Sequence, residues 1–433
     1  MNTLLQRPWL TRRVAAPRLG PQTRLAMPLA GNGNRLRFTE WLLLAVLAVA
    51  YIEAISAPLF GMQFHLTVLN HLPLLLMAPV LLLHMIGVLL NRNLPPWQSI
   101  FAVTWPLLLL GLYALAGSAV AKWEFGVRET FVTFGVYLLM LPLYAAAVPP
   151  SAERAHGWAR ALIAVWVMSS LIALAGELAR FSTSETLHEI EYLVLSGFFV
   201  LFCVARSRWT RLLALVLLLA AAGVNQKLTG YIIAAMAVVH IVAAASWRRS
   251  LPQWRPLVGV TAALLSVVLL AVLTLLYFEY RQYLPSGNVD VRMKQYESSF
   301  RQIVASPIWG NGYTQGSGEA YTEFMRVMNI PTHSDLIDIQ KHGGLIALTL
   351  FLWGYWAVFK LVNRAVKATV GDRVLNAYFV GVRFFQVTAM VTFAINPLLL
   401  KGPFLVVIWG NLGLALGLAL AVTKPRALPG ALP

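Results

Sequence analysis

Residues 257–278 read LVGVTAALLSVVLLAVLTLLYF, a run of 22 residues without a charged side chain, and Glu279 then opens a polar stretch that ends at Gly343. An apolar run of about 20 residues can cross the hydrocarbon core of a bilayer as an α-helix. Comparable runs recur, so we expect about twelve membrane-spanning helices, near residues 38–57, 72–90, 99–120, 131–148, 159–178, 190–205, 210–223, 228–246, 257–278, 344–363, 374–397 and 402–423. The run at 210–223 is short, which leaves eleven or thirteen spans open.

The composition indicates the same class of protein. Of 433 residues, 59% are hydrophobic and only 12% are charged. A soluble domain of this size could not cover so much apolar surface. Cys203 is the single cysteine, so neither a disulfide framework nor a cysteine metal site is expected. The expected fold class is an all-α polytopic membrane protein.

Positive charge is spread unevenly along the chain. A net charge of +17 would favour nucleic acid as the partner of a soluble protein, but no nucleic-acid partner is expected for a membrane chain. Seven arginines fall within residues 1–37, and no acid precedes Glu40. Such a stretch is typical of a basic tail close to anionic lipid headgroups. A start at Met27 would shorten that tail.

The loops between the apolar runs alternate between many and few cations. With a cytoplasmic N-terminus the inner loops carry most of the lysine and arginine, as the positive-inside rule requires. The polar stretch then faces outward, which for a bacterial inner membrane is the periplasm, and both termini are cytoplasmic. The expected division is a basic tail (1–37), spans one to nine (38–278), a periplasmic loop (279–343), spans ten to twelve (344–423) and a second cytoplasmic tail (424–433).

A few cations stand on the expected outer face against this bias. Each could be an interfacial side chain that extends toward the headgroups. As a set they favour an anionic ligand presented at the outer leaflet, such as a phosphate or pyrophosphate. The cations at helix ends on this face are Lys122, Arg128, Arg180, Lys227 and Arg292.

Acidic residues give no sign of a metal site. The first expected outer loop, Pro58 to His71, contains no Asp or Glu, and no D-x-D pair occurs in the chain. Hard divalent cations need oxygen ligands, so Arg and Lys would have to neutralise any bound phosphate. We expect no metal and no cofactor. Separately, Arg383 falls near the middle of a span, where an ionisable residue is usually paired or functional.

The outer loop contains one clear helical pattern. Its apolar face is expected to pack on the membrane domain, with Arg292 and Arg301 toward the polar side. Pro307, Gly310 and Gly312 should end this helix. The residues that recur at helical spacing are Met293, Tyr296, Phe300, Ile303 and Val304.

A short helix is expected near residues 321–328, and Thr332 or Ser334 can cap a further helix that runs through Gly343 into the next span. His333 then falls at or just before a helix N-terminus. The positive end of the helix dipole disfavours an imidazolium there, so His333 should be neutral and able to accept a proton. His342 is a weaker candidate on the same helix. An ordinary polar surface histidine is the alternative for both.

These residues resemble the O-antigen ligase and O-antigen polymerase superfamily of bacterial membrane glycosyltransferases. The family pattern is His, then Asn, Ser or Gln, nine residues, Gly, two residues, and Gly, Thr or Tyr. It falls on His333, Ser334 and Gly344, with Ala347 as a departure at the last position. The segment SPIWGNGY (306–313) resembles the family's Pro-x-x-Gly-x-Gly segment, and Arg292 occupies the place of its loop arginine.

One further departure concerns the connection between the seventh and eighth spans. The family usually has a Ser-Arg pair there, whereas this chain reads NQKLTGY, residues 225–231. Lys227 can supply the positive charge, but a lysine cannot reproduce the bidentate geometry of a guanidinium.

The resemblance implies a fold of the membrane glycosyltransferase C type (GT-C-like), with the large loop between the ninth and tenth spans. It implies a metal-independent, inverting transfer of a glycan from undecaprenyl pyrophosphate to an acceptor sugar hydroxyl of lipid A–core or another glycan, at the periplasmic face among the membrane lipids. His333 would be the general base and Arg292 a catalytic cation. The pyrophosphate would be held by Lys227, Arg128, Arg180, Lys122 and Arg301.

Three alternatives remain open. Within the superfamily, the chain could be an O-antigen or exopolysaccharide polymerase and not an O-antigen ligase. From another class, it could be a twelve-span secondary transporter, although its halves show no sequence repeat and its long loop is off-centre. It could also be a flippase or a non-catalytic scaffold of the envelope.

The predicted topology can be tested with reporter fusions. A reporter fused after Gly312 should read periplasmic, and one fused after Arg249 or Arg364 should read cytoplasmic, because the cation-rich loops stay inside. A cytoplasmic signal from the fusion at Gly312 would contradict the outward loop and every site built on it.

Overall fold

The computed structural model of the chain describes residues 36–59, 72–90, 95–120, 127–148, 151–180, 191–225, 228–249, 252–280, 287–312, 319–322, 325–329, 334–395, 398 and 402–423. Most of the predicted N-terminal tail and the whole predicted C-terminal tail lie outside these ranges.

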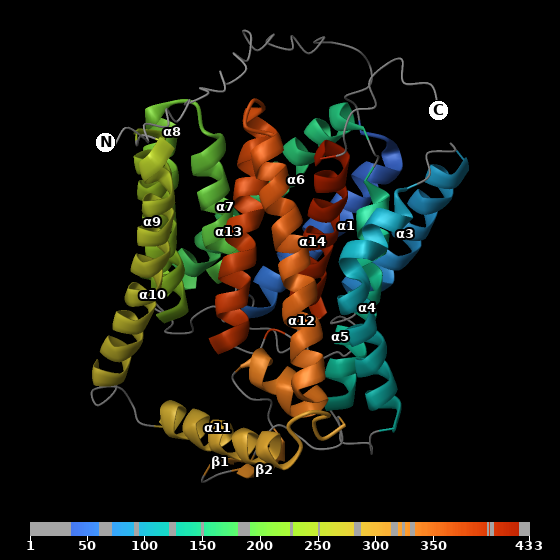
Figure 1. The fold of residues 1–433 in the computed structure, drawn as a ribbon, viewed down its shortest axis with the longest axis vertical. Helices are drawn as coiled ribbons and strands as arrows, with labels where there is room; N and C mark the ends of the chain where they lie inside the picture. The colour runs from blue at the N-terminus through green and yellow to red at the C-terminus, as the bar shows by residue number, and fades with distance from the viewer. Residues whose placement is uncertain are drawn as a thin grey trace, which may run out of the picture.

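The described residues form a bundle of helices, with the helix α11 and a small hairpin at one end (Figure 1). In chain order the elements are α1 (Phe38–Leu59), α3 (Leu72–Leu90), α4 (Trp97–Val120), α5 (Val127–Ala147), α6 (Ala152–Arg180), α7 (Glu191–Val204), α8 (Arg208–Asn225), α9 (Leu228–Arg249), the 3₁₀ turn η3 (Pro252–Trp254), α10 (Arg255–Tyr280), α11 (Gly287–Ala305), β1 (Glu319–Thr322), β2 (Met325–Asn329), α12 (Asp335–Ala368), α13 (Arg373–Ile395) and α14 (Gly402–Thr423).

A helix lies at each of the twelve apolar runs that the sequence predicts as spans. Among the described residues, six helices are long and apolar enough to cross a membrane: those at Trp97–Ala119, Arg154–Leu178, Thr229–Ser246, Asp335–Ala368, Arg373–Ile395 and Phe404–Thr423. The chain is therefore a helical protein with several candidate membrane spans. A total of twelve spans stays a prediction.

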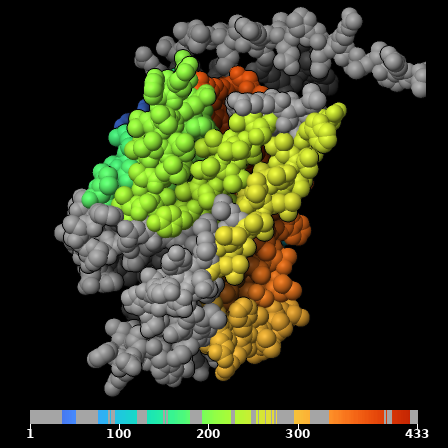
Figure 2. Space-filling model, turned by 90° about the vertical axis from the view of Figure 1, so that its left-hand side faces the viewer, coloured from blue at the N-terminus to red at the C-terminus, as the bar shows by residue number. Residues whose placement is uncertain are grey.

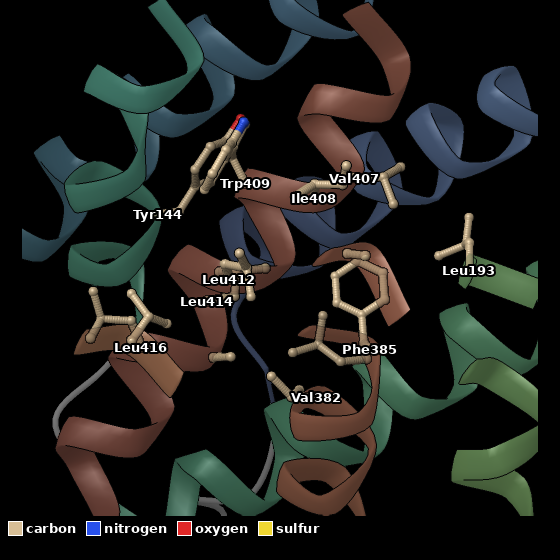
Figure 3. Packing of buried hydrophobic residues seen from close by; sticks show 14 of the residues in the cluster. Tyr144, Leu193, Val382, Phe385, Val407, Ile408, Trp409, Leu412, Leu414 and Leu416 are labelled. Atoms are coloured by element: carbon tan, nitrogen blue, oxygen red, sulfur yellow. The ribbon is translucent and has the colours of Figure 1, made fainter. Parts of the chain in front are cut away.

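Helix α14 forms the centre of the core. In its apolar window 89% of the residues are buried, against 33% for α9. Figure 3 shows Ile408, Trp409 and Leu412 of α14 among side chains from neighbouring helices, including Tyr144. A Cβ atom at Gly417 would overlap the carbonyl of Ala145 on α5. Small residues at this contact let the two helix backbones approach closely, as is common between membrane helices.

One ion pair and one histidine–carboxylate contact connect helix ends that the sequence places on the cytoplasmic side. Near the start of α1, Glu40 pairs with Arg154 of α6. Further along α6, His156 Nδ1 lies 2.9 Å from Asp372 Oδ2, in the turn between α12 and α13. The starts of α1 and α6 and the α12–α13 turn therefore share one end of the bundle, as the predicted topology requires.

The opposite end carries α11 and the strands β1 and β2 (Figure 1). The prediction of a short helix near residues 321–328 is wrong, because β1 and β2 pair there as antiparallel strands. Tyr321, Thr322 and Val327 favour extended backbone, and pairing the two strands satisfies backbone groups that a single helical turn would leave open. Apart from this hairpin the described elements are helical, in agreement with the predicted class of an α-helical polytopic membrane protein.

The predicted orientation of α11 is wrong in part, because Phe300 and Val304 of the predicted packing face do not pack on protein. Its buried stripe consists of Gln295, Ser299 and Ile303, whereas Phe300 and Val304 are 53% and 78% exposed. The sequence prediction assumed that an apolar face must pack on protein. Close to a membrane, the exposed apolar side of an amphipathic helix can face the lipid interface instead.

Candidate functional site

The candidate site lies at the start of α12, where the helix meets the outer loop. Ser334 has extended backbone (φ −163°, ψ 110°), and its side chain accepts a hydrogen bond from the backbone N–H of Ile337 at 3.4 Å. This is the N-cap geometry that satisfies one of the unpaired N–H groups of a first turn. Of the two capping residues that the sequence allowed, Ser334 is therefore confirmed. His333, which itself lies outside the described residues, directly precedes this cap.

Helix α12 continues from this cap through the two glycines into the next span, but it is kinked at Gly344 (φ 66°, ψ −168°). The segment that follows α11 fits into the kink, and we call this paired structure, residues 307–312 with residues 341–346, the clasp. Four backbone hydrogen bonds join its two segments: Asn311 N to Lys341 O (2.9 Å), Gly312 N to His342 O (3.1 Å), Leu345 N to Pro307 O (2.9 Å) and Ile346 N to Ile308 O (3.4 Å).

Two glycines permit the close approach within the clasp. Gly310 (φ 71°) and Gly344 both have backbone in the left-handed region, which other residues rarely adopt. A Cβ atom at Gly344 would overlap the carbonyl of Ile308, and one at Gly310 would overlap the carbonyl of His342. Gly310 and Gly344 are therefore needed for the structure, because only glycine lets residues 307–312 and 341–346 come into contact.

Charged and polar side chains are buried along the first turns of α12. Asp335, Asp338, Lys341 and His342 are each at most 4% exposed. Lys341 Nζ lies 3.4 Å from Asp338 Oδ1, and Asp335 Oδ2 accepts a hydrogen bond of 2.6 Å from the backbone N–H of Leu398. Asp335 therefore ties the start of α12 to the connection between α13 and α14. Ionisable groups this close to a span are usually functional or paired.

His342 has a defined set of neighbours. Its Nδ1 lies 3.0 Å from Asn311 Oδ1, and the amide nitrogen of Asn311 donates to Gln302 Oε1 at 3.1 Å. Because that amide nitrogen is engaged, the oxygen faces His342, so Nδ1 of His342 carries the proton. The ring also lies edge-on to Phe131 of α5, with centroids 4.6 Å apart. His342 thus connects α5, α12 and the clasp, which is a structural role.

Arg128 is brought close to the clasp. It is the second residue of α5, one helical turn before Phe131, which contacts His342. Arg180 is the last residue of α6, and the described contacts do not connect it with the clasp. The side chains of Arg128 and Arg180 are outside the description, as are Lys122 and Lys227 altogether.

The two arginines of α11 occupy different faces of that helix. Arg301 is 78% exposed on its side chain and pairs with Glu297 one turn away, at 2.5 Å. This exposure confirms its predicted polar side. Position 292 belongs by helical spacing to the stripe of Gln295, Ser299 and Ile303, whereas the sequence prediction placed it with Arg301. Its side chain is outside the description.

Sequence reasoning missed Asp335, Asp338 and Lys341. A signal was available, because the three recur at i, i+3 and i+6 within a helix that starts in the outer loop. In the part of the chain that the structure describes, no three His, Cys, Asp or Glu side chains gather as a metal site requires. The expectation of a metal-independent site stays a prediction.

Comparison with known protein families found no family that matches the chain, and comparison with curated proteins found no relative. Membership of the O-antigen ligase and polymerase superfamily therefore remains a prediction from the motif residues.

The clasp can be tested by adding a methyl group. Gly344→Ala should lower the free energy of unfolding by about 1–3 kcal/mol or more. Alanine is strained at positive φ, and its Cβ would overlap backbone atoms of Ile308. Gly371→Ala is the matched control, since nothing lies within 4 Å of a Cβ there. Thermal unfolding in detergent compares the two. An unchanged unfolding temperature for Gly344→Ala would contradict the clasp.

Proposed function

We propose that the chain is a membrane glycosyltransferase that moves a glycan from undecaprenyl pyrophosphate to an acceptor sugar hydroxyl at the periplasmic face, as an O-antigen ligase. The observation that carries the proposal is the clasp. The two segments that resemble the family's motifs, residues 306–313 and 333–347, are joined by backbone hydrogen bonds at the outer end of α12. The motif glycines have a physical function in this contact, which supports a shared architecture over a chance match.

The start of α12 supports a catalytic role for His333. The first turns of this helix are fixed by three contacts: the N-cap by Ser334, the hydrogen bond from the backbone N–H of Leu398 to Asp335, and the clasp. A reacting group is best held on such a rigid element. In the proposed reaction His333 takes the proton of the acceptor hydroxyl while that oxygen attacks the anomeric carbon. The bond to the pyrophosphate oxygen breaks, so undecaprenyl pyrophosphate leaves and the configuration inverts.

Cations stabilise the charge that develops on the leaving group. Arg292 and Lys227 are proposed to bind the pyrophosphate together with Arg128, which lies one turn from the residue of α5 that contacts His342. Arg180 and Lys122 stay in the proposal as further cations. Arg301 is the weakest member, because it already pairs with Glu297 at an exposed position.

One reconstitution assay separates the alternatives. Purified protein receives a lipid-linked glycan donor and either lipid A–core or a second donor as the acceptor. Transfer to lipid A–core supports the ligase, and elongation of the lipid-linked glycan supports the polymerase. If the folded protein releases no glycan with either acceptor, the transporter and the scaffold remain as the candidate functions.

The role of His333 gives a sharp prediction. His333→Ala should lower the transfer rate by about a hundred- to ten-thousandfold, the usual effect of losing a positioned proton acceptor. Binding of undecaprenyl pyrophosphate should persist, because a neutral imidazole contributes little to holding an anion. Glutamine should not restore transfer, since an amide cannot take the proton. His156→Gln, at the other end of the bundle, is the control. Transfer near the normal rate by His333→Gln would remove the general base but not the family.

The pyrophosphate cations give a second prediction. Arg292→Ala and Lys227→Ala should each lower turnover efficiency about ten- to hundredfold, because each removes one charge-assisted contact of about 1.5–3 kcal/mol. Lys227→Arg should be tolerated. Arg364→Ala, an exposed cation of α12 at the opposite end, serves as the control. If both alanine variants transfer glycan within twofold of the unmodified protein, neither residue belongs to the site.

A further inference from the structure

Two adjacent cavities lie among α7, α8, α9, α10, α12 and α13, away from the clasp. The first has a volume of about 490 Å³ and extends from Arg211 and Arg373 to Arg383. The second has a volume of about 900 Å³ and lies between the pair α9 and α10 and the pair α12 and α13. The two cavities share part of their walls, and His240 and Arg383 are among the residues that line both. Neither cavity belongs to the proposed glycosyltransferase site.

The first cavity is positively charged. Arg211, Arg373 and Arg383 line it, and no Asp or Glu does. Arg211 Nε donates to the carbonyl of Ala205 at 3.1 Å, and Arg373 donates to the same carbonyl. The nearby carboxylate of Asp372 is engaged with His156 at 2.9 Å. Among the described residues Arg211 and Arg373 thus donate to a neutral carbonyl, and neither forms an ion pair with a carboxylate.

The partners of Arg383 are neutral as well. Its Nη2 lies 2.9 Å from His240 Nε2, and its Nη1 donates to Asn363 Oδ1 at 3.4 Å. A guanidinium only donates, so Nε2 of His240 must accept, which makes this histidine the neutral form with its proton on Nδ1. A half-buried guanidinium within a span is costly unless it is compensated. These partners leave its full positive charge available to an anion.

The lining of the second cavity is mainly apolar, and the cavity offers room for a hydrocarbon chain. Its wall on α10 consists of Val258, Gly259, Ala262 and Ser266. Val258, Ala262 and Ser266 are spaced four residues apart and are half-buried, between exposed neighbours. Helix α10 packs mainly against α9, and it runs along the outside of the face in Figure 2. The cavity is therefore bounded on one side by a peripheral helix that would face lipid.

We propose that these cavities bind a phosphate-bearing lipid, with its phosphate in the arginine-lined cavity and its hydrocarbon chain along α10. The combination of charged and apolar space argues for an amphiphile. Guanidinium groups match phosphate oxygens in bidentate geometry, and cavities of about 300–1,000 Å³ are usual for bound ligands of this size. A free anion would occupy only the first cavity, so it would not account for the mainly apolar second cavity beside it.

The site lies at the end of the bundle opposite α11. Arg373 starts α13, and Arg383 follows ten residues later, about 15 Å along the helix axis. The predicted topology puts this end in the cytoplasm, so the lipid belongs to the cytoplasmic leaflet. It is thus distinct from the donor that the proposed function takes from the periplasmic side.

Thermal unfolding of the purified, delipidated full-length protein in mixed micelles tests the proposal. Phosphatidylglycerol should raise the unfolding temperature with saturable binding, while phosphatidylcholine should do so much less, because its choline offsets the phosphate charge. Arg383→Gln should weaken phosphatidylglycerol binding about ten- to hundredfold. Arg364→Gln is the matched control, since Arg364 is an exposed arginine of α12 that lines neither cavity.

A second variant keeps the test decisive if Arg383→Gln fails to fold. Ala262→Phe leaves every arginine in place but fills the apolar cavity from α10, and it should weaken phosphatidylglycerol binding by at least tenfold. Equal binding of the two lipids would overturn the proposal. So would normal phosphatidylglycerol binding by Ala262→Phe, or an equal shift with inorganic phosphate alone, which would indicate a site for a free anion.

Discussion

The kink of α12 at Gly344 is the constraint on which the end of the bundle that carries α11 depends. A helix that departs from its regular path leaves backbone N–H and C=O groups without partners, and such groups are costly near a membrane. Residues 307–312 supply those partners through four hydrogen bonds. The kink therefore fixes the segment after α11, and that segment in turn holds Asn311 against His342. A larger side chain at position 310 or 344 would push apart the two segments of the clasp.

Hydropathy predicted the positions of the long helices, because a bilayer demands apolar length irrespective of the packing partner. Capping chemistry also narrowed the helix start to Thr332 or Ser334, of which the structure has Ser334, since an unpaired first turn needs a side-chain oxygen wherever the helix lies. The same local reasoning failed for α11. Its buried face contains Gln295 and Ser299, and periodicity cannot distinguish an apolar face that packs on protein from one that faces lipid.

The candidate site was harder to predict than the fold. The family resemblance identified the two motif segments, but only the backbone contacts explain why each needs glycine. The buried pair of Asp338 and Lys341 was missed, because charged residues in a loop are ordinarily solvated and sequence spacing does not reveal burial. Removing one partner of such a pair is costly, while the intact pair contributes little net stability. Its presence beside the motif therefore favours a functional reason over a stabilising one.

The arginines at the other end need two separate explanations. The predicted topology would account for Arg211 and Arg373, because the positive-inside rule requires only that cations remain in or next to cytoplasmic loops. It does not account for Arg383, which lies ten residues inside α13 and has only His240 and Asn363 as described hydrogen-bond partners. A leucine at that position would be equally compatible with the positive-inside rule, and it would avoid the cost of desolvating a guanidinium. The proposed anionic ligand supplies what topology cannot, since it would compensate the half-buried charge of Arg383, which lines both cavities.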